Sequence, residues 1–222
     1  MKKFITFLFL ISFIVACKQD PFVESKGRLR LINASYLAGD INMYIDYDPV
    51  FATGTQYLNY SLFRDFIAGK RSLIIKNATN TLADTVVNIA ENTSYSIIIY
   101  DSANTIRYKQ LQETFITPTG SNCKVRFMHL SNDAPTVNVV QQFDTNFTFS
   151  NYQNGDTSNY IPMPTGYHSF KVKNALNDSV LYTNYFEYQP GFFYTLYLKG
   201  NVTSQWVDSL GIFTIKDNGN YQ

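Results

Sequence analysis

The sequence predicts an all-β protein made of two tandem immunoglobulin-like antiparallel β-sandwich domains that follow a lipoprotein signal peptide. Aromatic residues make up 16% of the 222 residues, with 17 Tyr and 18 Phe, and aromatic and β-branched residues favour half-buried strands. After the first 16 residues, no segment keeps apolar residues at helical spacing over three turns between recognisable caps. Short strand-like runs recur instead, and their order repeats in the second half of the chain.

Strand-like runs in the first half follow one another at short intervals. Residues 28–33 alternate polar and apolar side chains, as expected for a strand with one face in water, and residues 41–46 repeat that pattern. Because no helical segment exists to cover a sheet, a second sheet must bury the apolar face, which favours a sandwich. Further strands are predicted at 73–76, 85–89 and 95–100, with turns at 38–40, 68–69 and 91–92.

The second half repeats the first at a slowly growing offset. The offset between partners rises from 96 through 97 to 99, as expected when loops lengthen between matched strands. We therefore predict one module at residues 27–120 and a second at residues 121–222. Four pairs of segments match in order: 30–35 with 126–131, 41–43 with 137–139, 69–78 with 166–175, and 95–99 with 194–198.

Residues 125–139 (VRFMHLSNDAPTVNV) and 160–166 (YIPMPTG) carry a resemblance to a known family. The first segment resembles the opening strand, Ser-Pro-Asp-Ala-Pro-type turn and second strand of the bacterial family called domain of unknown function 4397. The second segment resembles the Pro-Ala-Gly-like turn of that family, whereas residues 35–40 (SYLAGD) lack the Asp-Ala-Pro triplet. The resemblance covers most of both halves. It implies a β-sandwich in the cell envelope and no established activity.

The first residues predict a lipoprotein. Two lysines precede an apolar run over residues 4–16, which is too short to span a bilayer but fits a signal peptide. Residues 14–17 (IVAC) resemble the lipobox, where signal peptidase II cuts after a small residue and the cysteine carries a diacylglycerol thioether. A buried helix that happens to contain a cysteine is the alternative. We predict a signal peptide at 1–16, lipidation of Cys17 and a polar tether over residues 17–26.

The expected location follows from this anchor. A lipidated cysteine followed by Tyr- and Asn-rich β-modules resembles envelope lipoproteins of the Bacteroidota, many of which are displayed on the cell surface. Such display often follows an acidic stretch beside the lipidated cysteine, and here residues 18–20 (KQD) offer a single acid. We expect a lipid anchor in the outer membrane, on the periplasmic or the surface-exposed face, and favour the surface.

Charge is balanced along the chain, which has a formal net charge of +1. Residues 27–122 contain eight Lys/Arg and eight Asp/Glu, and residues 123–222 contain six and seven. Neither half has the basic excess that binding to a phosphate backbone requires. Nucleic acid is therefore not an expected partner.

Few residues could carry catalysis. With the other cysteine lipidated, Cys123 is an unpaired thiol at the start of a strand, and inert packing is favoured over a catalytic role. His129 aligns with Asn33, and His168 aligns with Arg71. Neither histidine lies in a catalytic or metal-binding motif. We expect strand histidines, no catalytic residue and no cofactor.

Paired acids offer one alternative. Asp46 and Asp48 could share one face of a strand, since residues two apart do so, and carboxylates in that arrangement can begin a calcium site. The EF-hand-like pattern is missing, and Asp133 and Asp156 fit ordinary turns. Calcium stays an alternative, and no metal site is predicted.

Aromatic clusters give the strongest indication of function. They exceed what a small sandwich needs inside, and strand alternation sends half of the side chains outward. Exposed tyrosines could stack on sugar rings or form a protein interface, although packing between the sandwiches or along cross-strand ladders is the alternative. The clusters are Tyr182, Tyr185, Phe186 and Tyr188, and Phe192, Phe193, Tyr194 and Tyr197.

The expected function is that of a non-enzymatic, membrane-anchored accessory or structural subunit that binds another envelope protein. Tethering raises the effective concentration, so weak contacts from two modules can suffice. Carbohydrate binding is the first alternative, which the presence of a single tryptophan, Trp206, weakens. An adhesin-like module is the second alternative. No paired acids, nucleophile elbow or metal cluster in the sequence indicates an enzyme.

Overall fold

The computed structural model describes residues 24–142 and 147–217. The predicted signal peptide and Cys17 lie outside the described residues, so both cleavage and lipidation stay predictions. The described residues form strands and loops without a helix, which confirms the prediction of an all-β fold. No described segment is therefore a helix able to cross a membrane.

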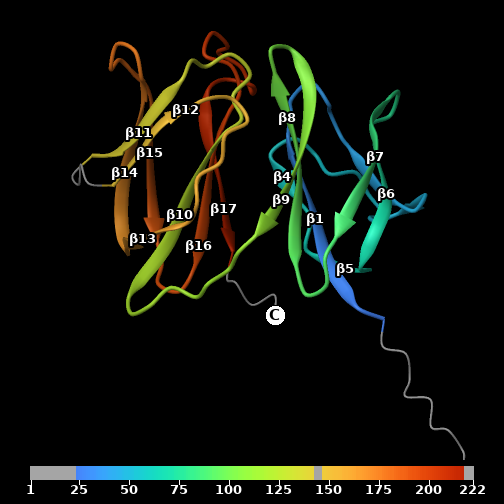
Figure 1. The fold of residues 1–222 in the computed structure, drawn as a ribbon. Coiled ribbons are helices and arrows are strands. Elements are labelled where there is room, and N and C mark those ends of the chain that lie inside the picture. The colour runs from blue at the N-terminus through green and yellow to red at the C-terminus, as the bar shows by residue number, and fades with distance from the viewer. Residues whose placement is uncertain (1–23, 143–146, 218–222) are drawn as a thin grey trace, which may run out of the picture.

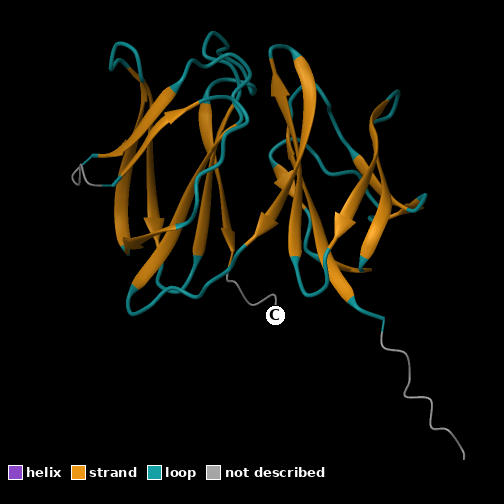
Figure 2. Cartoon of the chain, in the orientation of Figure 1, coloured by secondary structure: helices purple, strands orange, loops and turns teal. Residues whose placement is uncertain are grey.

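Strands β1–β9 form an N-terminal sandwich, and strands β10–β17 form a C-terminal sandwich (Figures 1 and 2). The N-terminal strands are β1 (Lys26–Ala34), β2 (Asn42–Ile45), β3 (Asp48–Pro49), β4 (Asn59–Tyr60), β5 (Arg64–Ile67), β6 (Gly69–Lys76), β7 (Thr81–Ile89), β8 (Ser94–Ser102) and β9 (Thr105–Glu113). The C-terminal strands are β10 (Asn122–His129), β11 (Val137–Gln141), β12 (Thr148–Tyr152), β13 (Ile161–Pro164), β14 (Gly166–Asn174), β15 (Val180–Tyr188), β16 (Phe193–Lys199) and β17 (Gly211–Asp217).

The sheets stack in four layers, with two inner sheets facing each other and one outer sheet on each flank (Figure 1). The N-terminal inner sheet has the order β4-β1-β8-β9, with β5 also paired to β1, and the C-terminal inner sheet has the order β13-β10-β16-β17. The outer sheets have the orders β3-β2-β6-β7 and β12-β11-β14-β15. Both halves thus share one strand order, although the predicted module boundaries at residues 120 and 121 stay predictions.

Two strands run parallel at the centre of each inner sheet, β1 with β8 and β10 with β16. Their registers correspond, because Arg30 pairs with Ser96 in one sheet and Arg126 pairs with Thr195 in the other. Parallel neighbours need a long crossover connection, which strands of the outer sheet provide here. Strand and turn patterns in the sequence do not reveal such a pair.

Three apolar cores hold the layers together. Leu31 belongs to the core between the N-terminal sheets, and Phe127 belongs to the core between the C-terminal sheets. The third core lies between the two inner sheets and includes Ile32 and Met128; we call this interface the seam. Successive side chains on a strand point to opposite faces, so β1 and β10 are each buried on both faces.

The seam corrects one expectation from the sequence. The alternation in residues 28–33 predicts a strand with one face in water, but Arg30 on that face is only 1% exposed. The C-terminal inner sheet covers this face of β1. A buried guanidinium is costly unless it is paired, so its partners are described below.

Candidate functional site

His129 makes a structural hydrogen bond. Its side chain is fully buried at the end of β10, and Nε2 lies 3.0 Å from the carbonyl oxygen of Pro135, to which it can only donate. Asn33, at the matching place in β1, donates from Nδ2 to the carbonyl oxygen of Gly39 at 2.7 Å. The two acceptors are also 96 residues apart. Burial lowers the pKa of His129, which favours the neutral ring.

His168 is also engaged in structure. Its Nε2 donates to the carbonyl oxygen of Pro164 at 2.9 Å, so Nδ1 is the acceptor for Gln141 Nε2 at 2.8 Å. Arg71 at the matching position donates from Nε to the carbonyl oxygen of Ile67 at 3.0 Å. Each histidine therefore donates a hydrogen bond that Asn33 or Arg71 donates at the matching place in the other sandwich. Neither Asn nor Arg acts as an acid or base at neutral pH.

Cys123 is a packed thiol. It is completely buried in β10, its Sγ lies 3.4 Å from the carbonyl oxygen of Met163, and burial raises the pKa of the thiol to about 11. A thiol of that pKa is almost wholly protonated at neutral pH and is a poor nucleophile. The environment of Cys123 fits the packing role predicted from the sequence.

Asp46 and Asp48 do not share one strand face. Asp46 lies in the two-residue turn between β2 and β3, with a φ of 50°, and Asp48 pairs with Ile45. Asp46 accepts from the backbone N of Ser72 at 3.0 Å and pairs with Arg71 at 3.1 Å, so its oxygens are engaged. Within the described residues, no group of three or more His, Cys, Asp or Glu could hold a metal ion. The prediction that Asp46 and Asp48 share one strand face, on which the calcium alternative rested, is therefore wrong.

The turn at residues 131–136, which carries the family resemblance, fastens neighbouring loops. Ser131 Oγ donates to the carbonyl oxygen of Gly200 at 2.6 Å, and Asp133 accepts from the backbone N of Val202 at 2.7 Å. Asn132 reaches across the seam, where its Nδ2 donates to Asn104 at 2.8 Å. The polar residues of this turn thus connect β10 to the loop after β16 and to the other sandwich.

The matching turn at residues 35–40 is fastened by a different carboxylate. Asp101, which is 6% exposed at the end of β8, accepts from the Ser35 hydroxyl and from the backbone N of Tyr36 (2.9 Å) and Leu37 (3.3 Å). Burial raises the pKa of Asp101, and these hydrogen bonds partly offset the rise. The missing Asp-Ala-Pro triplet is therefore replaced by an acid from a neighbouring strand.

Four buried charges meet at the seam. Arg30 binds both oxygens of Asp217 at 2.8 and 3.1 Å and also Glu113 at 3.1 Å. Arg126 lies 2.8 Å from Glu113. The side chains of all four residues are at most 3% exposed. Each arginine thus pairs with an acid of the opposite sandwich, so the network joins the two halves.

The network is balanced in charge but uneven in its electrostatics. Burial alone would raise the pKa of Glu113, but the guanidinium groups of Arg126 and Arg30 outweigh it and lower the pKa to about 2. For Asp217, burial dominates over Arg30 and raises the pKa. Removing one partner from such a group leaves a buried charge uncompensated, which costs about 3–5 kcal/mol. The network therefore ties the two sandwiches to one relative arrangement.

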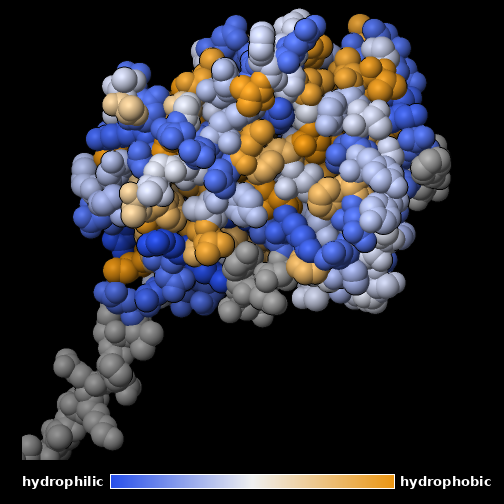
Figure 3. Space-filling model, turned by 180° about the vertical axis from the view of Figure 1, so that it is seen from behind, coloured by the Kyte–Doolittle hydropathy of each residue, from blue (hydrophilic) through white to orange (hydrophobic). Residues whose placement is uncertain are grey.

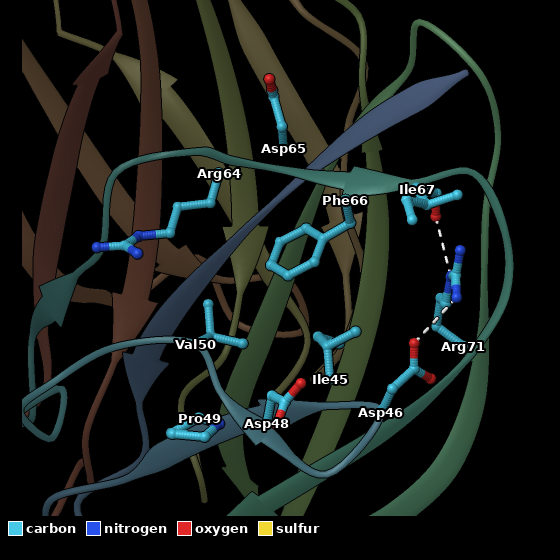
Figure 4. A pocket seen from close by; sticks show the side chains of 10 residues that line it. All are labelled: Ile45, Asp46, Asp48, Pro49, Val50, Arg64, Asp65, Phe66, Ile67 and Arg71. Carbon is cyan, nitrogen blue, oxygen red and sulfur yellow. Dashed lines mark hydrogen bonds and ion pairs between the residues drawn. The ribbon is translucent and has the colours of Figure 1, made fainter. Parts of the chain in front are cut away.

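A cleft of about 360 Å³ opens at one end of the N-terminal sandwich, between the β2–β3 turn and β5 (Figure 4). We call it the end cleft. The ring of Phe66 points into it, facing Ile45 and Val50, which form an apolar wall. Arg71 and Asp46 lie on the rim as an ion pair. The carboxylate of Asp48 also faces the cleft and has no polar partner among the described residues.

The C-terminal sandwich fills the matching place with an aromatic ring. The backbone N of Gln141 donates to the carbonyl oxygen of Phe147 across the turn between β11 and β12. Ile45 and Asp48 are the corresponding partners across the turn between β2 and β3. Phe147 is 7% exposed, and its ring packs against Phe149 and Phe170 at 5.4 and 5.5 Å. The end cleft thus exists where a polar residue replaces a core aromatic.

The aromatic clusters divide between core and surface. Tyr188, Tyr194, Tyr197 and Phe193 are at most 1% exposed and pack inside. Tyr185 is 66% exposed and stacks on Tyr167, with ring centroids 5.7 Å apart and an interplanar angle of 13°. Trp206 is 82% exposed. Most of the predicted aromatic surface is therefore core, and the stacked pair on β14 and β15 is the exception.

Sequence reasoning missed the charge network and the end cleft. A signal for the first was present, because Arg30 and Arg126 occupy the same position of the repeat in otherwise apolar strands. A charge retained at one place in both copies of a buried strand indicates a shared partner. For the end cleft no comparable signal exists, since Asp48 lies outside the matched segments.

These features define two β-sandwiches, joined by a shared core and a buried charge network, in which the candidate acid–base and nucleophilic side chains make structural contacts. The model of the family described as domain of unknown function (DUF4397) matches residues 27–140. The chain belongs to this family, whose description assigns no activity. No curated relative matches the sequence.

Two solved structures show a weak similarity to this chain. The structure titled "The Bacillus anthracis TIE protein" has 9% sequence identity and a TM-score of 0.27 over 78% of this chain, which spans about a third (34%) of that protein. The structure titled "Alpha-glucan recognition by family 41 carbohydrate-binding modules from streptococcal virulence factors" has 13% identity and a TM-score of 0.26. It is matched over 88% of this chain and 99% of that one. Similarity at this level carries no argument about ligand or activity.

Proposed function

We propose that the protein is a non-enzymatic, lipid-anchored protein of the cell envelope that binds another envelope protein through the end cleft. The observation that carries this proposal is the cleft itself, an opening where the other sandwich has a closed aromatic core. In the cleft the exposed carboxylate of Asp48 lies beside the half-buried ring of Phe66, so that a partner would meet a charge and an apolar surface together. The end cleft is therefore the proposed contact site for a protein partner.

The chemistry of the end cleft specifies the partner segment. Phe66, Ile45 and Val50 offer contact to an apolar side chain, and Asp48 offers an ion pair to a cation. A volume of about 360 Å³ is at the lower end of the range for ligand pockets and holds one or two side chains. We expect the partner to insert an apolar residue next to a Lys or Arg.

A non-enzymatic role is supported by the use of the reactive groups. His129, His168 and Cys123 each make a bond within a sandwich or pack in a core. None of them faces the end cleft. A binding role needs only the rigid surface that the seam provides.

The membrane anchor rests on the sequence around Cys17. Replacement by Ala in the native bacterium removes the thiol that accepts the lipid. We expect Cys17→Ala to lose incorporation of labelled palmitate and to move the protein from the membrane to the soluble fraction. Retention of both label and membrane association in the variant would place the anchor elsewhere.

Isolation from native membranes tests the partner. The full-length protein at its normal expression level is cross-linked and recovered as wild type, Asp48→Lys and the matched surface control Tyr185→Ala. A reversed charge at the contact weakens a complex strongly, so we expect the partner with wild type and control and an about tenfold lower yield with Asp48→Lys. Asp48 is exposed, so the fold tolerates this change.

Two results would overturn the proposal. Recovery of the wild type as a free monomer would leave the accessory-subunit role without a partner. Recovery of one partner in equal yield from all three proteins would place the contact outside the end cleft.

Carbohydrate binding is the second candidate, and the stacked pair Tyr167 and Tyr185 is the observation that favours it. Both rings lie on the exposed face of the outer sheet formed by β12, β11, β14 and β15. An exposed aromatic face can stack on a sugar ring. A glycan array probed with wild type and with the double variant Tyr167→Ala/Tyr185→Ala tests this: the candidate requires a signal that the variant loses.

A further inference from the structure

A second cavity, which we call the seam pocket, lies where the two sandwiches meet. It has a volume of about 280 Å³. Gln112 and Thr114 at the end of β9 form one side, and Lys124 and Arg126 of β10 form the other. Figure 3 shows that apolar side chains gather along the middle of one face of the molecule, between the two sandwiches. The seam pocket thus presents two cations, Lys124 and the network residue Arg126, beside the apolar part of the seam.

The two seam arginines differ in how completely they are paired. Arg30 uses Nε for Ser96 at 2.7 Å, and both of its terminal nitrogens bind carboxylates of Glu113 and Asp217. Arg126 uses Nε for Thr195 at 2.8 Å and Nη2 for Glu113. Its Nη1 has no hydrogen-bond partner among the residues the structure describes. The Nη1 group of Arg126 is therefore an unused hydrogen-bond donor, although the residue is only 3% exposed.

The asymmetry has a simple cause in side-chain length. Glu113 pairs in register with Ser94, and Asp217 pairs with Phe193 at the matching place, so the two acids are counterparts. Glu113 reaches both arginines, whereas Asp217 is one methylene shorter and gives both of its oxygens to Arg30. Arg126 therefore lacks the second carboxylate that its counterpart has.

Charge and donor groups in the seam pocket favour an anion. The four network charges cancel, so Lys124, two residues from Arg126 on the same face of β10, leaves the site positive. No Asp or Glu lines the pocket. The side chains of Gln112, Thr114 and Asn159 have no polar partner within the described residues and can donate.

We propose that the seam pocket binds the oxyanion group, a carboxylate or a phosphate, of a small ligand. Arg126 Nη1 and Lys124 Nζ supply charge-assisted hydrogen bonds, which are about twice as strong as neutral ones. Leu111 and Ile116 form apolar walls for the body of the ligand. A ligand held there contacts both sandwiches and raises the stability of the whole protein.

Thermal unfolding of the full-length protein in a nonionic detergent tests the site. The probes are sodium phosphate and sodium glucuronate, with ionic strength held constant by NaCl and glucose as the neutral counterpart of glucuronate. We expect a saturable rise in the midpoint of about 2–4 °C with at least one oxyanion and none with glucose. The two anions separate a phosphate site from a carboxylate site.

Variants of exposed or half-buried residues avoid disturbing the network. Lys124→Gln removes the charge, Gln112→Glu introduces a repelling acid, and Lys171→Gln on the outer sheet is the matched control. We expect about tenfold weaker apparent affinity in the first, no saturable shift in the second and wild-type behaviour in the control. Equal shifts in wild type and Lys124→Gln, or no saturable shift with either anion in the wild type, would overturn the proposal. Loss of partner binding at the end cleft would leave this result unaffected.

Discussion

At the turn after its first strand, the N-terminal sandwich binds the turn backbone with Asp101 of β8, whereas in the C-terminal sandwich Asp133 of the turn accepts from the backbone N of Val202, in the loop after β16. Asp101 corresponds to Gly200, where a Cβ would collide with the backbone oxygens of Asp208 and Ser209. A side chain is therefore impossible at position 200, and the acid is found in the turn instead. In both halves a carboxylate joins this turn to the end of the neighbouring parallel strand or the loop after it, but the carboxylate and the backbone N–H that it binds have exchanged sides.

The histidines extend this comparison. Asn33 and His129 donate to equivalent carbonyl oxygens, and so do Arg71 and His168. What the two halves share is the position of a donor, while the residue type that supplies it differs. A histidine whose place is taken by Asn or Arg in the other half has a structural role. The number of histidines alone is therefore a poor guide to catalysis.

The largest difference that we expect between the halves is at the seam. Arg30→Met leaves Asp217 buried without a cation, which costs about 3–5 kcal/mol. Arg126→Met also leaves one buried negative charge in excess, but Glu113 keeps its bond to Arg30, so we expect a smaller loss of about 3 kcal/mol, at the low end of the range for a broken buried pair. Urea unfolding of the two variants measures both. Equal losses would mean that the network is shared evenly, contrary to its hydrogen bonds.

The turn carboxylates give the next largest contrast. Asp101→Ala removes the acceptor for three donors at a buried site, and we expect a loss of about 2–4 kcal/mol in the free energy of unfolding. Asp133→Ala removes one exposed hydrogen bond, for an expected loss of about 0.5–1 kcal/mol. Denaturant unfolding of the pair tests the comparison, which fails if Asp133→Ala is the more destabilising change.

The end cleft can be closed by making one half more like the other. Asp48→Phe places a ring where the C-terminal sandwich has Phe147, and burial against Phe66 is expected to stabilise the protein by about 1 kcal/mol. The same change blocks the proposed partner contact. Asp48→Ala is the control, since it removes the charge without filling the cleft and shifts stability by less than about 0.5 kcal/mol. A destabilised Asp48→Phe protein would show that the two ends are not equivalent.

Periodicity and repetition in the sequence were enough to predict the all-β class and the corresponding strands. The strand predicted at 41–46 overlaps β2, and the strand predicted at 95–100 lies within β8, because a strand pattern is a local signal that survives in a packed sheet. β9 was not predicted, since Thr105–Glu113 is mostly polar on an edge strand. The parallel pairing and the seam depend on contacts between residues far apart in the sequence, which no local pattern encodes.

The site was harder to predict for a related reason. The alignment of His129 with Asn33 correctly indicated a histidine on a strand, since both residues lie in a matched segment. Asp48 and Phe147 lie just beyond the matched segments. Two residues separate Ile45 from Asp48, whereas five separate Gln141 from Phe147. The comparison that exposes the end cleft therefore needs the sheet register as well as the sequence.

The smallest expected effect tests whether His129 and Asn33 are interchangeable. His129→Asn keeps a donor to Pro135, as Asn33 does to Gly39, so we expect a loss below about 1 kcal/mol at pH 7.5. Burial lowers the pKa of His129 below its value in the unfolded chain, about 6.5. The unfolded chain therefore binds more protons as the pH falls below that value, and the wild type loses stability there.

The variant lacks this group and should lose less stability between pH 7.5 and pH 5.5 than the wild type does. Urea unfolding at the two pH values measures the difference, and Asn33→His provides the reciprocal change in the other sandwich. If the donor alone matters, Asn33→His gains the pH dependence that His129→Asn gives up. An unchanged pH dependence in His129→Asn would show that the pKa of His129 is the same in the folded and the unfolded protein, contrary to the burial argument.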